Sequence, residues 1–459
     1  MDTEGSISTI KALYIRDSEV RQVEFKSFLS MCQGLLQSSS DTNQNLFRTK
    51  YEKTIIRLAV ECPLLDIRSA SEEFLQANRI SYDPRIVEAI SAFIPAYDVK
   101  PLNGQGTCRS DEEKSLYLST IQELFFTFGR VGHIDRIMGA FPEYMQNHFD
   151  LIKELLFESG PLQVDWRIYI AYMASAAHKC DYLMSACEEQ GKLYGSKASW
   201  FTSQGFSEIP GKIRDLGTVN IKLAHRPWDL DENDIQSLLG NWQISELCHA
   251  LVILCVFHSL SSLALGLGIC PEYDLIRHNR RASVSDELGE DEDDYDRTAG
   301  GYLTYIHYDI IAHRRPVRPS DFNWNDQGFN IIEKCLPGIA EKLMNRIRYT
   351  FVMTFDSMGG EEGQNTANLR RAIWMYTQRV YGLEYDDYDY GNVNGHIKRQ
   401  TKTYIKEVAC VPHRVTRRHI DLLDMKLVSE DIIHINFLVC EARLETELIY
   451  TTNAVQAFI

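Results

Sequence analysis

The feature that most constrains the fold is a long apolar stretch, "ELCHALVILCVFHSLSSLALGLGIC", at residues 246–270. It is long enough to span a bilayer. However, it contains His249, His258 and three serines, and ionisable residues are rare inside membrane spans. The stretch therefore favours a helix buried in the core of a soluble protein, with a membrane span as the less favoured alternative.

Composition narrows the class of protein further. The 459 residues, of which 44% are hydrophobic and 24% charged, are typical of a soluble globular chain with more than one core. With 48 Lys and Arg against 64 Asp and Glu, the net charge of −16 would repel a phosphate backbone, so we expect no nucleic-acid binding. The first residues lack a basic segment followed by an apolar one, so nothing there indicates a secretion signal or a membrane span.

The eleven cysteines are scattered singly, with no CxxC pair. This pattern indicates reduced thiols rather than disulfides or a zinc site, and we expect no metal and no cofactor.

Helical periodicity continues along the whole chain, and no run of alternating strands is long enough to build a sheet. The sequence predicts an all-α fold. One example is a single buried helix face, spaced i, i+3, i+4, i+7 and i+11, formed by Leu369, Ala372, Ile373, Tyr376 and Val380.

Domain boundaries follow from breaks in this pattern. We predict a helical N-terminal extension at 1–88, a helical domain at 89–275, an acidic linker at 276–318 and a C-terminal helical domain at 319–459. Within the linker, eight of the eleven residues 286–296 are acidic, and such a segment cannot offset its ordering entropy, so we expect disorder. Arg280 and Arg281 before Ser283 resemble a kinase site, although short motifs of this kind usually arise by chance.

Six motifs, from residue 91 to the end, occur in the order found in the sestrin family: "SAFIP", "WRIYIAYMASAAHKCDYL", "LAHRPWDL", "LRRAIW", "YDDYDYG" and "HINFLVCEAR". The chain resembles that family, and residues 1–88 lie outside the resemblance. The resemblance implies two helical domains like the alkylhydroperoxidase (AhpD) fold, joined by the linker. It also implies a stress-responsive cytoplasmic protein, with the nucleus as an alternative location.

Two activities are implied by the resemblance. The first is repression of the target-of-rapamycin (TOR) kinase complex through binding of its upstream amino-acid-sensing regulatory complex, with release by leucine. The second is reduction of alkyl hydroperoxides by a thiol of the N-terminal domain.

The hydroperoxidase reading depends on a relay that this chain keeps only in part. Cys180 and Tyr182 match the family's Cys and Tyr, but Cys187 stands where the family has a His that would serve as general base. On one continuous helix, Cys180 and Cys187 would lie about 10.5 Å apart along the axis, too far for a disulfide, and His178 would point away from Cys180. The alternatives are a retained reactive thiol and two small core cysteines, and packing is favoured.

Four residues match the family's leucine pocket. Arg370 would hold the carboxylate, Thr366 and Thr350 would lie in the lid, and Glu430 would hold the ammonium, with Asp431 as the alternative because one extra residue makes the alignment ambiguous. Phe351 and Met353 replace lid residues with hydroxyls, and the family's pocket Trp is missing, so leucine binding could be weak or absent. Without the resemblance, Arg370 and Arg371 would be assigned to a solvated helix face.

The segment "EYDDYDY" at residues 384–390 contains four acids and three tyrosines. Tyrosines are enriched at protein interfaces, and no His is interleaved, so a metal site there is disfavoured. By resemblance, Asp386 and Asp387 contact the upstream regulatory complex. The kept acidic segment and the lost relay His together favour a regulatory binding protein over an enzyme.

Overall fold

The structure is a computed structural model that describes residues 10–104, 108–202, 205–276, 316–354, 357–386, 388–423 and 426–459. Most of the predicted acidic linker, with Ser283, lies outside the described residues, as does Asp387. The described part is built of helices, with a single two-stranded hairpin of β1 (Ser357–Met358) and β2 (Glu361–Glu362). The predicted all-α fold class is confirmed.

Contacts divide the chain into two compact units. The first comprises Met1–Phe149 and Ile269–Glu287, and the second comprises Asp150–Gly268 and Leu288–Ile459. These units group the chain differently from the boundaries predicted from sequence, which remain a prediction.

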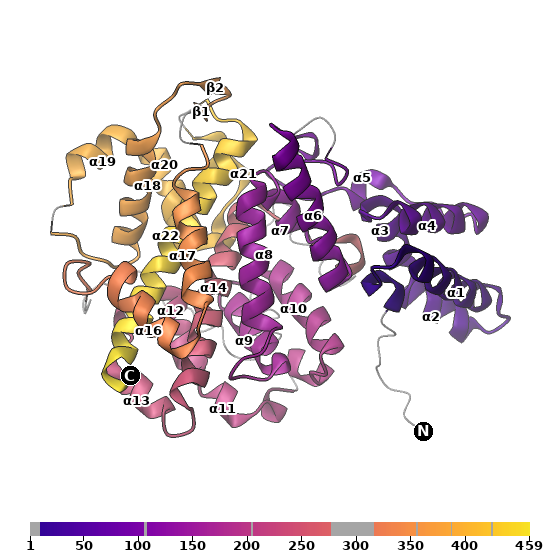
Figure 1. Ribbon diagram of the computed structural model, residues 1–459, viewed down its shortest axis with the longest axis horizontal. Coiled ribbons are helices and arrows are strands. Elements are labelled where there is room, and N and C mark those ends of the chain that lie inside the picture. Colours follow the sequence, from indigo (N-terminus) through magenta and orange to yellow (C-terminus); the bar gives the residue numbers. More distant parts are fainter. Residues whose placement is uncertain are drawn as a thin grey trace. The chain divides into compact units, whose positions relative to one another are not determined.

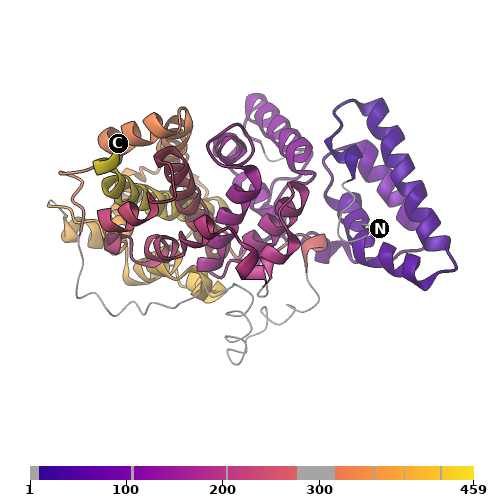
Figure 2. The ribbon, with the colours of Figure 1, turned by 90° about the horizontal axis from the view of Figure 1, so that it is seen from below.

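The first unit begins with four helices, α1 to α4, that lie side by side, as Figure 2 shows in indigo and violet. Its helices are α1 (Ser18–Gln37), α2 (Asp41–Lys50), α3 (Glu52–Glu61), α4 (Leu65–Ala77), α5 (Pro84–Val87), α6 (Asp111–Phe128), α7 (His133–Met138) and the start of α8 (Pro142–Leu156). Buried charges tie α3 to later parts of the unit. Arg57 pairs with Asp274 at 2.9 Å, and Glu61 accepts from the ring of His133 at 3.0 Å.

The second unit holds every described residue that the sequence assigned to a site. Its helices are α9 (Val164–Ala177), α10 (Asp181–Leu193), α11 (Gly211–Arg214), α12 (Gly217–His225), α13 (Glu232–Leu238), α14 (Ile244–Gly266), α16 (Phe329–Cys335), α17 (Ile339–Thr350), α18 (Ala367–Val380), α19 (Tyr390–His396), α20 (Arg399–Cys410), α21 (Arg417–Asp421) and α22 (Ser429–Val455). Helix α14 packs against α9 and α22, and α22 also contacts α17, α18 and α20 (Figure 1).

Helix α14 covers most of the apolar stretch at residues 246–270. It is the one helix of the described chain long and apolar enough to cross a membrane, and its most apolar window is 100% buried inside the structure. A helix that is apolar on all sides needs neighbours on all sides, and α9, α10, α12, α16, α20 and α22 supply them. Its burial agrees with the predicted core helix.

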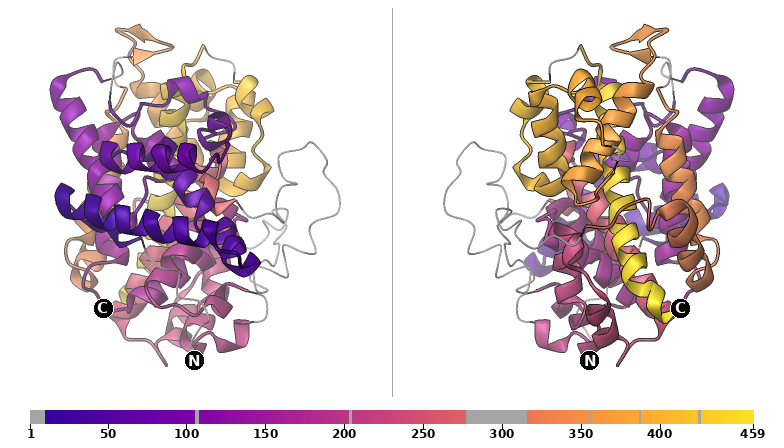
Figure 3. Two further views of the ribbon diagram at one scale, coloured as in Figure 1. Left: turned by 90° about the vertical axis from the view of Figure 1, so that its right-hand side faces the viewer. Right: turned by 90° about the vertical axis from the view of Figure 1, so that its left-hand side faces the viewer.

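The β1–β2 hairpin leads from α17 to α18 and projects beyond the helix ends, as both views of Figure 3 show in orange. Asp431, near the start of α22, accepts hydrogen bonds from the backbone N–H of Gly359 at 2.7 Å and of Val428 at 3.0 Å. This carboxylate therefore fastens the turn of the hairpin to the beginning of α22.

Candidate functional site

The predicted thiol segment is not one continuous helix. Helix α9 ends at Ala177, Lys179 adopts a left-handed φ of 55°, and Cys180 occupies the N-cap of α10. The Cys180 N–H donates back to the carbonyl of Ser175 at 3.0 Å, which closes the turn. The helical separation assumed for His178 and Cys180 is therefore wrong, because the two residues lie on either side of a helix break.

Cys180 is nonetheless in a poor position for thiolate chemistry. Its side chain is fully buried, and burial raises the pKa of its thiol to about 12, although the N–H groups of Leu183 and Tyr182 and the Ser261 hydroxyl act in the opposite direction. Cys187 is also buried, and burial raises the pKa of that thiol as well. Tyr182 is buried beside them. A nucleophilic thiol needs a lowered pKa and access to its substrate, and Cys180 has neither.

His178 does not replace the missing base. Its Nε2 accepts a hydrogen bond from Arg443 at 2.7 Å. Burial and the Arg443 charge hold the pKa of His178 well below its usual range. The ring is therefore neutral at physiological pH and supplies no cation to stabilise a thiolate at Cys180.

Arg443 instead belongs to a buried polar network at the centre of the second unit. It donates to Glu447 at 2.9 Å on its own helix, and both side chains are fully buried. Glu447 also accepts from the Tyr381 hydroxyl at 3.1 Å and bonds the ring of His258 at 2.8 Å. The other ring nitrogen of His258 faces the Asn220 Oδ1 at 2.9 Å.

This network joins helices α12, α14 and α22 to the residues that directly follow α9 and α18. Tyr381 follows directly after α18, and its hydroxyl also lies within hydrogen-bond distance of the Leu223 and Ala224 carbonyls in α12, at 2.9 and 2.7 Å. A buried ion pair is favourable only when its remaining hydrogen-bonding groups are satisfied, and here several neighbours satisfy both partners. No motif singled out this network in the sequence, although Arg443 and Glu447 are spaced i, i+4.

The residues predicted to bind leucine lie in two parts of the second unit. Arg370 is 4% exposed, which rules out the alternative that it lies on a solvated face, whereas Arg371 is exposed. Arg370 donates to the Thr366 hydroxyl, which in turn donates to the Thr354 carbonyl at 2.9 Å. Thr366 occupies the N-cap of α18, but its side chain makes no capping hydrogen bond.

Thr350 is fully buried at the end of α17, and its hydroxyl donates to the carbonyl of Arg346 at 3.0 Å. His434 of α22 joins this segment to Arg370. Its ring bonds the Thr350 carbonyl and the Thr354 hydroxyl, each at 2.6 Å. Burial, with a contribution from the Arg370 charge, lowers the pKa of His434 to about 4. Arg370, Thr366 and Thr350 are thus brought together through His434.

The proposed ammonium partner is less well placed. Glu430 is half-buried in the first turn of α22, while the alternative, Asp431, is buried and bonded to the hairpin as described above. Near Arg370 on α18, Trp374 packs on Phe351 with ring centroids 4.4 Å apart and donates to Glu445 at 3.2 Å. Trp374 follows Arg370 by four residues, a spacing that could have identified it. Burial raises the pKa of Glu445 to about 7.

In the acidic segment, Asp386, Asp389 and Tyr390 are exposed, and other residues contact two of its carboxylates. Asp386 is exposed, pairs with Arg318 at 3.2 Å and accepts from the Ser320 hydroxyl at 3.2 Å. Asp389 caps α19 by accepting from the N–H of Asn392 at 2.9 Å. At the end of the segment, the rings of Tyr388 and Tyr390 meet edge to face. Among the described residues, no group of His, Cys, Asp and Glu side chains is arranged to hold a metal ion.

Comparison with known proteins identifies the family of this chain. The family model described as "PA26 p53-induced protein (sestrin)" matches residues 90–305 and 303–459, which is well over half of the chain. The chain belongs to the sestrin family. Sestrin-2 of Mus musculus is 30% identical over 461 residues, covering 84% of this chain and 92% of that protein. Sestrin-1 of the same organism is 27% identical over 485 residues, covering 85% of this chain and 97% of that protein.

The family resemblance read from the sequence is thereby confirmed. Helices α1 to α5, up to Val87, precede the range that the sestrin model matches. All the predicted site residues, from Cys180 to Glu430, lie inside it. Family membership does not by itself assign their roles, which remain predictions.

Proposed function

We propose that this sestrin-family chain is a regulatory binding protein that represses the TOR kinase complex by binding its upstream amino-acid-sensing regulatory complex. The binding surface is the acidic loop around Asp386 and Asp387. The observation that carries the proposal is the contrast between the exposed Asp386 and the buried Cys180. Binding of a partner needs side chains that reach solvent, as Asp386 does. Peroxide turnover needs a thiol that its substrate can reach, and the buried Cys180 does not provide one.

The surroundings of Asp386 support a docking role. The hydrogen bond from Ser320 to Asp386 and the cap at Asp389 restrain the described residues of the loop before a partner arrives. A preorganised loop loses less conformational freedom on binding. Its exposed ion pair with Arg318 contributes little stability, because the pair lies in water, so a partner's basic group can replace Arg318 at small cost.

Leucine is proposed as the ligand that releases this partner. Support comes from the buried Arg370 at the start of α18, where the helix dipole also favours a carboxylate. The indole of Trp374 offers an apolar wall one turn away, in a chain that lacks the family's pocket Trp. A cytoplasmic location, with the nucleus as an alternative, belongs to the same proposal.

Co-precipitation tests the docking surface. The double variant Asp386→Lys/Asp387→Lys is expected to lose the upstream complex, while Glu361→Lys/Glu362→Lys, an equal charge reversal on the exposed β2 strand, retains it. Cys180→Ser should bind like the parent chain. Equal recovery of the complex by the first variant and the parent would refute the proposed surface.

Calorimetry with leucine tests the ligand. Binding heat is expected for the parent chain and for Arg371→Ala, whose side chain is exposed, but not for Arg370→Ala. If leucine at millimolar concentration gives neither heat nor thermal stabilisation with the parent chain, leucine is not the ligand.

A further inference from the structure

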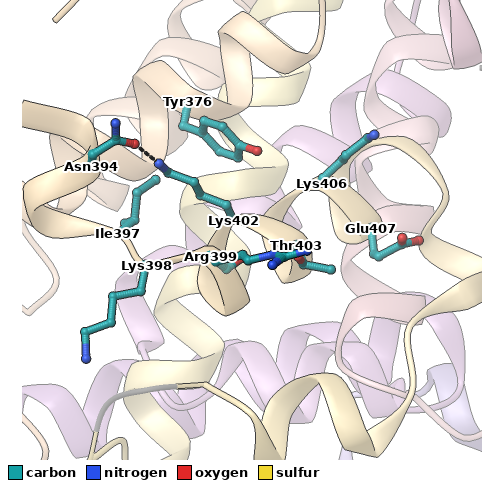
Figure 4. Close-up of a pocket in the computed structure, with 9 residues that line it drawn as sticks. All are labelled: Tyr376, Asn394, Ile397, Lys398, Arg399, Lys402, Thr403, Lys406 and Glu407. Carbon is teal, nitrogen blue, oxygen red and sulfur yellow. Dashed lines mark hydrogen bonds between the residues drawn. The ribbon is translucent and has the colours of Figure 1, made fainter. Parts of the chain in front are cut away.

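A surface pocket outside the sites discussed above lies between α18, α19 and α20. Its volume is about 580 Å³, within the range of roughly 300–1,000 Å³ typical of small-molecule sites. Most of its polar lining comes from the first two turns of α20 and the residue before that helix. Figure 4 shows these side chains around the opening, with Lys402 reaching Asn394.

The lining is strongly basic for a chain with a net charge of −16. Four of the nine lining residues are cationic, namely Lys398, Arg399, Lys402 and Lys406, and Glu407 is the one carboxylate among them. A concentration of one sign of charge around a concave surface raises the local potential and attracts ions of the opposite sign.

This arrangement is costly for the helix itself. Arg399, Lys402 and Lys406 follow each other at i, i+3 and i+7, so neighbouring positive charges repel along one face. The first turn of α20 contains no acid, and its N-cap, Lys398, makes no side-chain capping bond. Cations at a helix N-terminus also oppose the helix dipole. A bound anion would relieve all three effects.

We propose that this pocket binds a polyphosphorylated anion. The planar guanidinium of Arg399 can hold two oxygens of one phosphate, and Lys402 and Lys406, on successive turns, can each contact a further phosphate as point charges. The Thr403 hydroxyl lies on the same wall. Several cations spread over two helical turns suit a ligand with several phosphates better than a single carboxylate. This site is separate from the acidic docking loop, so the proposal does not depend on the proposed function.

Lys402 is already poised for such a ligand. It bonds the amide oxygen of Asn394, and its ammonium lies 5.8 Å from the centroid of the Tyr376 ring. Both contacts hold the long side chain at the pocket without neutralising its charge. Glu407 has the opposite effect, because its carboxylate repels phosphate.

Titration of the full chain with inorganic tripolyphosphate and with inositol hexakisphosphate tests the site. We expect saturable binding that weakens as salt is raised, since the contacts are ionic. Lys402→Gln/Lys406→Gln should weaken binding at least roughly tenfold, the loss expected when charge-assisted contacts are removed. Glu407→Gln should strengthen binding several-fold. The matched control Lys192→Gln/Lys197→Gln removes two lysines elsewhere in the same unit and should bind like the parent.

Circular dichroism of each variant, with unchanged spectra and melting, separates a lost site from a lost fold. Vesicles with and without a phosphoinositide lipid distinguish a soluble ligand from a lipid headgroup, since both carry the same phosphate chemistry. Sulfate at equal ionic strength should not compete. Binding that is absent in the parent, equal in the Lys402→Gln/Lys406→Gln variant, or abolished by sulfate would overturn the proposal.

Discussion

The buried Arg443–Glu447 pair makes a quantitative prediction about stability. In Glu447→Gln the shape is kept, and the amide oxygen still accepts from Arg443 and Tyr381. The neutral ring of His258 can then accept from the new amide N–H and donate to Asn220. The hydrogen bonds of the network are therefore largely preserved, and the change removes the negative charge alone.

What remains is a fully buried guanidinium whose other hydrogen-bond partners, among them His178, Tyr381 and the Ala224 carbonyl, are neutral. Removing one partner of a buried pair costs about 3–5 kcal/mol. The unit that contains this pair has roughly 290 residues, and at about 2.1 cal/mol/K of unfolding entropy per residue each kcal/mol shifts its midpoint by about 1.6 °C. The thermal midpoint should therefore fall by roughly 5–8 °C.

Differential scanning calorimetry at pH 7 is the assay, and Glu445→Gln is the matched control. The same substitution two residues away on α22 removes a carboxylate whose pKa burial raises to about 7, so little stabilising charge is lost. A midpoint for Glu447→Gln within 2 °C of that control, an effect of about 1 kcal/mol, would refute the view that Glu447 neutralises a buried cation.

Three further predictions follow from named contacts. Burial raises the pKa of Cys180 from 9.0 to about 12, which lowers its thiolate fraction near pH 8 roughly a thousandfold. Iodoacetamide should therefore label Cys180 far more slowly than the half-buried Cys108, as measured by mass spectrometry. Equal labelling rates would contradict the burial of Cys180. Burial raises the pKa of Glu445 from an ordinary 4.5 to about 7 in the folded state, so the free energy of unfolding should fall as pH rises from about 4.5 to 7. Glu445→Gln should therefore have a higher thermal midpoint than the parent at pH 8 but not at pH 4.5. A difference that does not depend on pH would be inconsistent with this. Asp431→Ala should speed amide hydrogen exchange at Gly359, because the hairpin loses the carboxylate that fastens it to α22, whereas unchanged exchange would count against that role.

The sequence predicted the helical class and the core role of residues 246–266 because a helix that is apolar on all sides is stable in a soluble protein only when it is buried. It did not predict the break between α9 and α10. Lys179 is not a glycine, so its residue type does not predict a left-handed conformation. Backbone hydrogen bonds to carbonyls at the end of α9 hold this conformation, and no local sequence pattern predicts them.

The candidate site was predicted unevenly for similar reasons. The burial of Arg370 could not be read from "LRRAIW", because two adjacent arginines look alike until the packing of α18 buries one and exposes the other. Likewise, Arg443 and Glu447 resemble an ordinary surface i, i+4 pair in sequence. Only the packing of α14 and α18 against α22 shows that both are buried.

We propose that this sestrin acts by binding through its acidic loop and not through its thiol. The most direct measurement is TOR substrate phosphorylation in sestrin-deficient cells that express the parent chain, Cys180→Ser or Asp386→Lys/Asp387→Lys at equal levels. We expect full repression by the parent and by Cys180→Ser, and none by the double charge reversal. Repression that is lost in Cys180→Ser and retained in the charge reversal would contradict it.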